Sequence, residues 1–150
     1  MKLAKGDLFR DAFADVILVT TNDFVKSNGS LVMGRGAAAQ LAKMYPEVPF
    51  SFGKLIKGSA SPSHYGVVID PMSRGSRMYG AFQVKHEWFS KADLTLITYS
   101  CLGLENLAKI LPNWRFALNF PGIGNGQLSR EDVLPIIENF LPDNVEVWEF

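Results

Sequence analysis

Two glycine-rich segments carry the residue types most suited to chemistry, residues 28–37 (NGSLVMGRGA) and residues 121–126 (PGIGNG). Glycine lets a backbone approach a phosphate closely, and a helix N-terminus offers free N–H groups with a partial positive charge. Each segment lies between a predicted buried strand and a predicted helix, where ligands of open α/β sheets bind. Either segment alone fits a simple chain turn equally well. Together they predict a diphosphate held from two sides.

A dinucleotide-binding fingerprint is the competing interpretation of the first segment. Residues 34–39 (GRGAAA) match the pattern G-x-G-x-x-A. That fingerprint requires its glycines directly after the first strand, whereas here a long loop separates them from the apolar run of residues 16–20. The pattern G-x-x-x-x-G-K-[ST] of a P-loop is absent from the sequence. We therefore reject both nucleotide-binding motifs.

The remaining reactive side chains indicate no metal or cofactor site. His64 and His86 have no convergent ligands in the sequence, so we expect surface or hydrogen-bonding roles for both. Cys101 lies in an apolar helical stretch and is expected in the core. Asp132 follows Ser129 at the spacing of a helix cap, which explains it better than acid catalysis does.

The elements that must position these residues alternate along the chain. Strands are predicted at residues 2–5, 16–20, 65–69, 78–84, 116–120 and 145–149, the third and fourth forming a hairpin. Helices are predicted at residues 35–45, 92–111 and 129 to about 140. We expect the second helix to break near Gly103 and Pro135 to bend the third or shift its start. This order predicts an α/β domain, a mixed sheet between helices on both faces, over residues 1–150.

Bulk composition excludes some classes of function. The 150 residues include 15 Lys and Arg against 15 Asp and Glu, so the field needed to coat a long polyanion is missing. The single cysteine excludes a disulfide within the chain. Neither an apolar signal region nor a run of membrane-spanning length occurs, so we expect a cytoplasmic protein without membrane contact.

The motifs resemble the macro domain family, in consistent order from residue 2 to the C-terminus. The resemblance rests on residues 5–8 (KGDL), 19–22 (VTTN) with Asn28, 33–37 (MGRGA) and 119–126 (NFPGIGNG). It implies the macro fold, a three-layer α/β/α sandwich with a mixed sheet. Residues 82–88 (FQVKHEW) resemble a segment of the branch that contains terminal ADP-ribose protein glycohydrolase, antitoxin macro domains that remove ADP-ribose from DNA, and ADP-ribose-1″-phosphate phosphatases of yeast and phage. Lys85 takes the place of that branch's catalytic lysine.

The resemblance also implies roles for particular residues. Asp7 would meet the adenine amino group beside the Leu8 backbone, and Asn22 and Asn28 would lie near the distal ribose, Asn28 being a catalytic candidate with Lys85. The diphosphate would be held by two sets of residues: Gly34, Arg35, Gly36 and Ala37, and Pro121, Gly122, Ile123, Gly124, Asn125, Gly126 and Gln127. The sequence departs from the glycohydrolase branch after the second loop, where an acidic residue or paired glycines often stand. Its first carboxylates there are Glu131 and Asp132.

Three functions follow from the resemblance. The first is ADP-ribose binding with hydrolysis of an ADP-ribosyl linkage, in which neutral Lys85 is the nucleophile. The second is dephosphorylation of ADP-ribose-1″-phosphate. The third is non-catalytic recognition of ADP-ribosylated protein or nucleic acid. For Lys85 the alternative is an ordinary solvated lysine at a strand end. No cofactor is implied.

Overall fold

The computed structural model describes residues 1–150, and its strands form one six-stranded sheet. The strands are β1 (Lys2–Lys5), β2 (Val16–Thr21), β3 (Val67–Arg74), β4 (Arg77–Gln83), β5 (Phe116–Asn119) and β6 (Val145–Glu149). The α-helices are α1 (Leu8–Asp11), α2 (Gly36–Met44), α3 (Val48–Lys57), α4 (Leu94–Ile110) and α5 (Arg130–Phe140). Two 3₁₀ turns, η1 (Pro62–His64) and η2 (Gly124–Gly126), complete the list.

The sheet is mixed, with the order β1-β6-β5-β2-β4-β3. Every neighbouring pair is parallel except β3 and β4, which form an antiparallel hairpin. Five adjacent strands therefore point the same way. The loops that follow these five strands must meet at one edge of the sheet.

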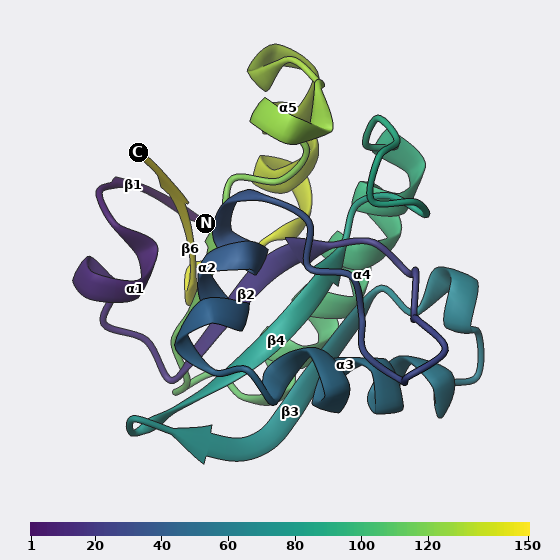
Figure 1. Ribbon diagram of the computed structural model, residues 1–150. Coiled ribbons are helices and arrows are strands. Elements are labelled where there is room, and N and C mark those ends of the chain that lie inside the picture. The colour runs from purple at the N-terminus through teal and green to yellow at the C-terminus, as the bar shows by residue number, and fades with distance from the viewer.

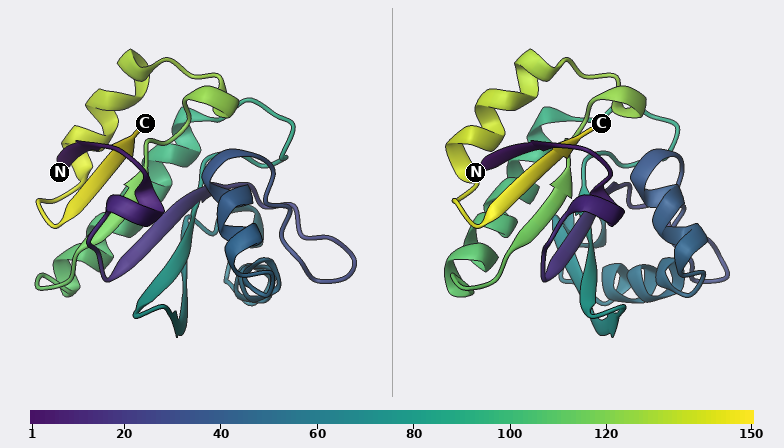
Figure 2. Two further views of the ribbon diagram at one scale, coloured as in Figure 1. Left: turned by 60° about the vertical axis from the view of Figure 1, so that its left-hand side comes forward. Right: turned by 90° about the vertical axis from the view of Figure 1, so that its left-hand side faces the viewer.

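Helices cover both faces of the sheet (Figures 1 and 2). Side chains of β2 alternate between the two layers, since Val16 and Leu18 pack in the cluster that contains α4 and α5. Ile17 and Val19 pack in the cluster that contains α1, α2 and α3. This period-two alternation, with apolar side chains on both faces, explains why a central strand has the sequence VILVTT. The predicted three-layer α/β/α fold with a mixed sheet is confirmed.

The predicted break of the second helix near Gly103 is wrong. Helix α4 runs unbroken through Gly103, because Cys101 and Leu104 on either side are fully buried and anchor it. The predicted cap of α5 is confirmed: the helix runs from Arg130 to Phe140 with Pro135 inside it, and the Ser129 hydroxyl accepts from Asp132 N–H at 3.2 Å. Helix α3 was not predicted, although its buried face fills the second core cluster. None of the helices has the length and hydropathy required to cross a bilayer.

Candidate functional site

A cavity of about 710 Å³ opens where the five parallel strands end. It is lined from each of them: Gly6 follows β1, Asn22 follows β2, Lys85 follows β4, Phe120 follows β5 and Phe150 follows β6. The parallel register brings these ends together, although they are up to 144 positions apart in the chain. The cavity is the place where an open α/β sheet of this topology binds ligands.

The first glycine loop ends at the N-terminus of α2, which faces the cavity. Arg35 is the N-cap residue of this helix and makes no side-chain hydrogen bond to it. Gly36 has φ +68°, a backbone conformation that L side chains rarely adopt. The first N–H groups of α2 therefore have no side-chain acceptor and lie beside the cavity. Such groups are suited to bind an anionic oxygen.

The second glycine loop faces the first across the cavity. A Cβ placed on Gly36 would lie 3.6 Å from Nδ2 of Asn125, so the two loops come into van der Waals range. Gln127 closes the 3₁₀ turn η2 in the left-handed region with φ +63°, which is uncommon for a residue other than glycine. At Gly122 close packing against the core requires a glycine, because a Cβ there would lie 2.7 Å from Ile97 Cδ1. The two loops form a cradle with backbone on both sides.

Lys85 lies in the wall of this cavity and has no ionic partner in the structure. Partial burial lowers the pKa of its amine below the ordinary value, because desolvation disfavours the charged form. Trp88 and Phe89 line the cavity beside it and remain largely exposed. A half-buried, unpaired amine among aromatic rings has the surroundings of a lysine nucleophile.

The cavity lining carries two cationic side chains and one side-chain carboxylate. The cations are Arg35 and Lys85, and the carboxylate is Glu149. Glu149 is bound on both oxygens by Arg130, with contacts of 3.1 and 3.2 Å. The local charge therefore favours an anionic ligand, and the one side-chain carboxylate at hand is already paired.

Most residues predicted for the site do line the cavity. They are Leu8, Asn22, Gly34, Arg35, Gly36, Ala37, Lys85, Gly122, Ile123, Gly124, Asn125, Gly126 and Gln127. Asn22 does so with its side chain already engaged, since Nδ2 donates to the Val32 carbonyl and Oδ1 accepts from Phe24 N–H, both at 2.8 Å. Its amide shapes the first loop.

Three predicted residues lie outside the cavity lining. Asn28 is at the exposed tip of a small hairpin between Val25 and Leu31, where its Oδ1 accepts from the backbone and hydroxyl of Ser30. Asp7 caps α1, with Oδ1 accepting from two backbone N–H groups at 3.0 and 3.2 Å. Pro121 is buried behind the second loop. The structure does not bring Asn28 into the cavity lining.

The cavity also includes residues that sequence reasoning did not select. Gln40 lies four positions after Gly36 on α2, and Trp148, Glu149 and Phe150 come from the end of β6. Helical spacing from Gly36 was an available signal for Gln40. For the β6 residues no signal existed before the strand order was known, because nothing in their sequence shows that β6 lies beside β5.

Neither the histidines nor the cysteine lines the cavity. No group of three or more His, Cys, Asp or Glu residues is arranged to hold a metal ion. His86 Nδ1 lies 2.7 Å from Asp23 Oδ2, and His64 Nδ1 lies 3.1 Å from the Ser63 hydroxyl. Cys101 is fully buried, and burial raises the pKa of its thiol to about 12.

A second hollow, of about 510 Å³, lies at the opposite end of the sheet between Lys2, Trp114 and Asn144. Its central polar side chain is occupied, because Asn144 Nδ2 donates to the carbonyls of Ala108, Leu111 and Trp114. It contains no glycine loop and no helix N-terminus. We therefore place the candidate site in the larger cavity.

Comparison with solved structures shows which fold this is. No protein-family model and no curated protein matches the sequence. The macrodomain of Thermus aquaticus DarG superimposes with a TM-score of 0.74 at 23% identity, covering 98% of this chain and 95% of that one. The macrodomain of Mycobacterium tuberculosis DarG gives 0.74 at 24% identity, covering 99% and 97%.

A third similar structure is Thermosipho africanus DarTG in complex with ADP-ribose. Its TM-score is 0.76 at 18% identity, over 98% of this chain and 41% of that one. The strand order, the layers and these likenesses agree. The chain has the macrodomain fold.

Proposed function

We propose that this chain binds ADP-ribose in the cavity between its two glycine loops. The observation that carries the proposal is the cradle itself, in which the uncapped N-terminus of α2 faces the loop around Asn125. A diphosphate needs backbone donors and cationic surroundings, and both occur here, where the one side-chain carboxylate is paired with Arg130. The similar Thermosipho africanus structure, which holds ADP-ribose, supports this choice of ligand.

The orientation of the ligand follows from the two ends of the cavity. The diphosphate lies between residues 34–37 and 123–127, and the distal ribose extends toward Lys85. The adenine lies toward Gly6 and Leu8, where Asp7 Oδ2 accepts no hydrogen bond within the protein and is free for the adenine amino group. We retain Asp7 on that ground as a proposed adenine contact.

We further propose that Lys85 promotes hydrolysis of an ADP-ribosyl linkage. The neutral Nζ attacks C1″ of the distal ribose, the bond from C1″ to the modified group breaks, and that group leaves with the electron pair and takes up a proton. The resulting glycosylamine opens to a Schiff base, which water hydrolyses to free ADP-ribose and the regenerated amine. The lowered pKa of Lys85 increases the fraction of amine available for this attack.

Non-catalytic recognition is the second candidate, and one observation favours it. Glu149, the carboxylate in the cavity lining, is held by Arg130 and is therefore poorly placed to assist Lys85. A reader of ADP-ribosylated partners would need the cradle and not the acid. Such a protein would bind ADP-ribose and release no product from a modified substrate.

Calorimetric titration with ADP-ribose and with AMP tests the binding proposal. We expect a dissociation constant for ADP-ribose on the order of micromolar, as for other small ligands held in a cleft by a few polar anchors. AMP lacks the diphosphate and the distal ribose and should bind much more weakly. Equal affinity for the two nucleotides would contradict the two-loop cradle. Phosphate release from ADP-ribose-1″-phosphate would instead identify a phosphatase.

A further inference from the structure

Lys85 lies just beyond the end of β4. The backbone around it is still hydrogen-bonded to the end of β2 and the residues that follow β2. Val84 N–H donates to the Thr21 carbonyl at 2.9 Å, and Asp23 N–H donates to the His86 carbonyl at 3.1 Å. These bonds extend the β2–β4 ladder past both strands. The backbone on either side of Lys85 is thus bonded to Thr21, the last residue of β2, and to Asp23, which precedes the first glycine loop.

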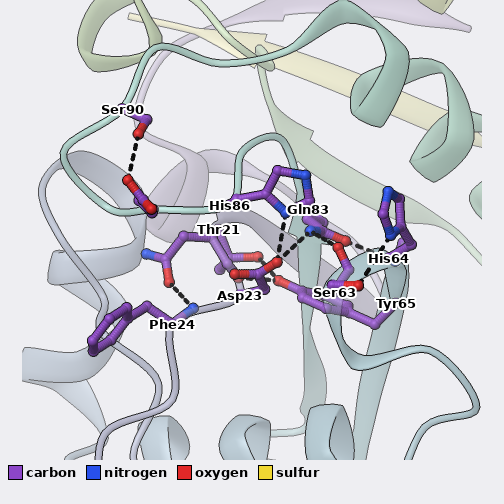
Figure 3. A network of polar contacts seen from close by, with 12 residues as sticks. Thr21, Asp23, Phe24, Ser63, His64, Tyr65, Gln83, His86 and Ser90 are labelled. Carbon is purple, nitrogen blue, oxygen red and sulfur yellow. Dashed lines mark hydrogen bonds and ion pairs between the residues drawn. The ribbon is translucent and has the colours of Figure 1, made fainter.

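One carboxylate oxygen joins both flanks of Lys85. Asp23 Oδ2 lies 2.7 Å from His86 Nδ1 and 3.3 Å from Gln83 Nε2, as Figure 3 shows. Because an ionised carboxylate only accepts, both nitrogens act as donors to it. The Asp23 side chain is 16% exposed, so water competes little for these bonds.

The Gln83 side of this arrangement is rigid. Gln83 is fully buried, and its Nε2 donates to the Ser63 carbonyl at 2.9 Å. The backbone carbonyl of Gln83 accepts from the Ser100 hydroxyl at 2.6 Å. The His86 side is different, because residues 86–89 are exposed. His86 makes no side-chain hydrogen bond other than the one to Asp23. Asp23 therefore joins a fixed anchor to the exposed segment that begins at Lys85.

We propose that Asp23 is a positioning residue, which sets the place of the Lys85 amine in the cavity by binding Gln83 and His86. This inference rests on the proposed function of Lys85. Asp23 itself is not in the cavity lining, so we expect it to make no contact with the ligand. Its effect must appear in the reaction of the lysine and not in the binding of ADP-ribose.

The first test compares two carboxylates at opposite ends of β2. Asp23→Ala removes the contact to His86, whereas Asp15→Ala removes a carboxylate that accepts from Arg115 N–H at 2.7 Å, far from the cavity. Since a misplacement of about 1 Å can lower a rate about 100-fold, we expect kcat for ADP-ribose release to fall roughly 10- to 100-fold in Asp23→Ala. The dissociation constant for ADP-ribose should change by less than about threefold. Asp23→Asn should recover part of the loss, because its amide oxygen still accepts from His86.

A loss of kcat in Asp23→Ala no larger than in Asp15→Ala would overturn the proposal. So would a weakening of ADP-ribose binding that accounts for the whole loss of activity. Thermal unfolding of both variants shows whether a lower rate reflects a smaller folded fraction. The conservative variant Asp23→Asn is a second control for such a loss of folded protein.

A second test does not depend on turnover. Reductive methylation with formaldehyde and cyanoborohydride, followed by peptide mass spectrometry, measures the reactivity of Lys85 relative to the exposed Lys91 in the same molecule. Asp23→Ala should change this ratio by about threefold or more, because the amine moves to different surroundings and its neutral fraction changes. An unchanged ratio would refute the positioning role. Absence of ADP-ribose release from the wild type would refute the proposed hydrolysis but not the positioning of Lys85 by Asp23, which this second test measures separately.

Discussion

Both ends of the sheet contain polar hydrogen-bond donors, but the donors at one end have partners within the protein and those at the other end do not. At the amino ends of β5 and β6, Asn144 Nδ2 donates to three backbone carbonyls, one in the last turn of α4 and two in the residues that follow this helix. At the carboxyl ends, the first N–H groups of α2 have no side-chain acceptor, and Lys85 has no ionic partner. A fold satisfies its polar groups wherever it can, so groups left open around a cavity indicate a ligand. We therefore expect the amino end to serve stability and the carboxyl end to serve the proposed binding.

The largest effect is expected for Lys85. Both Lys85→Ala and Lys85→Arg should lower ADP-ribose release by about 1000-fold or more, because neither methyl nor guanidinium can act as the nucleophile. Binding of ADP-ribose should be retained in both. In the wild type, the rate should rise with pH as the amine loses its proton, with a midpoint below the usual lysine value of about 10.4, since burial lowers the pKa. Substantial release by the Arg variant would exclude the covalent mechanism.

The next effect is expected in the cradle. Gly36→Val should weaken ADP-ribose binding by about 100-fold or more, because its side chain enters the space of the diphosphate and its φ of +68° disfavours a β-branched residue. Calorimetry measures the affinity, and circular dichroism shows whether the variant folds.

A pair of alanine variants separates the two causes at Gly36. Gly29 also has a positive φ, +92°, and a Cβ there would meet nothing within 4 Å. Gly36→Ala and Gly29→Ala therefore introduce a similar kind of backbone strain, of about 1 kcal/mol. Only Gly36→Ala should weaken binding. Equal affinities in the two variants would make Gly36 a turn residue without contact to ligand.

The amino end should respond in stability and not in binding. Asn144→Ala removes the side-chain donor of three carbonyls, of which that of Leu111 still accepts from Trp114 N–H, and should lower the free energy of unfolding by about 1–3 kcal/mol. Urea unfolding measures this change. The affinity for ADP-ribose at a temperature where the variant is folded should equal that of the wild type. A binding defect would show that the two ends are coupled.

The smallest effect concerns the carboxylate in the cavity lining. Arg130→Gln frees Glu149 to repel the diphosphate and should weaken ADP-ribose binding about two- to fivefold at low salt, with a smaller effect at high salt. The double variant Arg130→Gln with Glu149→Gln should restore the affinity. If Arg130→Gln binds as the wild type does, the pair is a surface ion pair without influence on the ligand.

Particular residues show how far sequence reasoning reached. The end of β2, the two glycine loops and the strand before Lys85 were predicted from local signals. Thr20 and Thr21, residues 33–37, residues 122–127 and Val84 from these segments line the cavity. Asn28 was placed near the ribose by family resemblance, yet the hairpin between Val25 and Leu31 carries it to the surface. Helix α3 was missed although Val48, Phe52 and Ile56 recur at the spacing of one helix face, a signal that the sequence does contain.

By itself, the sequence determined which segments form strands and where the glycines interrupt them, because hydrophobic periodicity and backbone freedom are local properties. Only the tertiary structure decided which strand ends are neighbours, and so which side chains share the cavity. The pairing of Glu149 with Arg130 and of Asp23 with His86 arises in this way, since each joins residues 19 or 63 positions apart. Charges and donors act over a few ångströms of space, and only the folded sheet determines which of them lie that close.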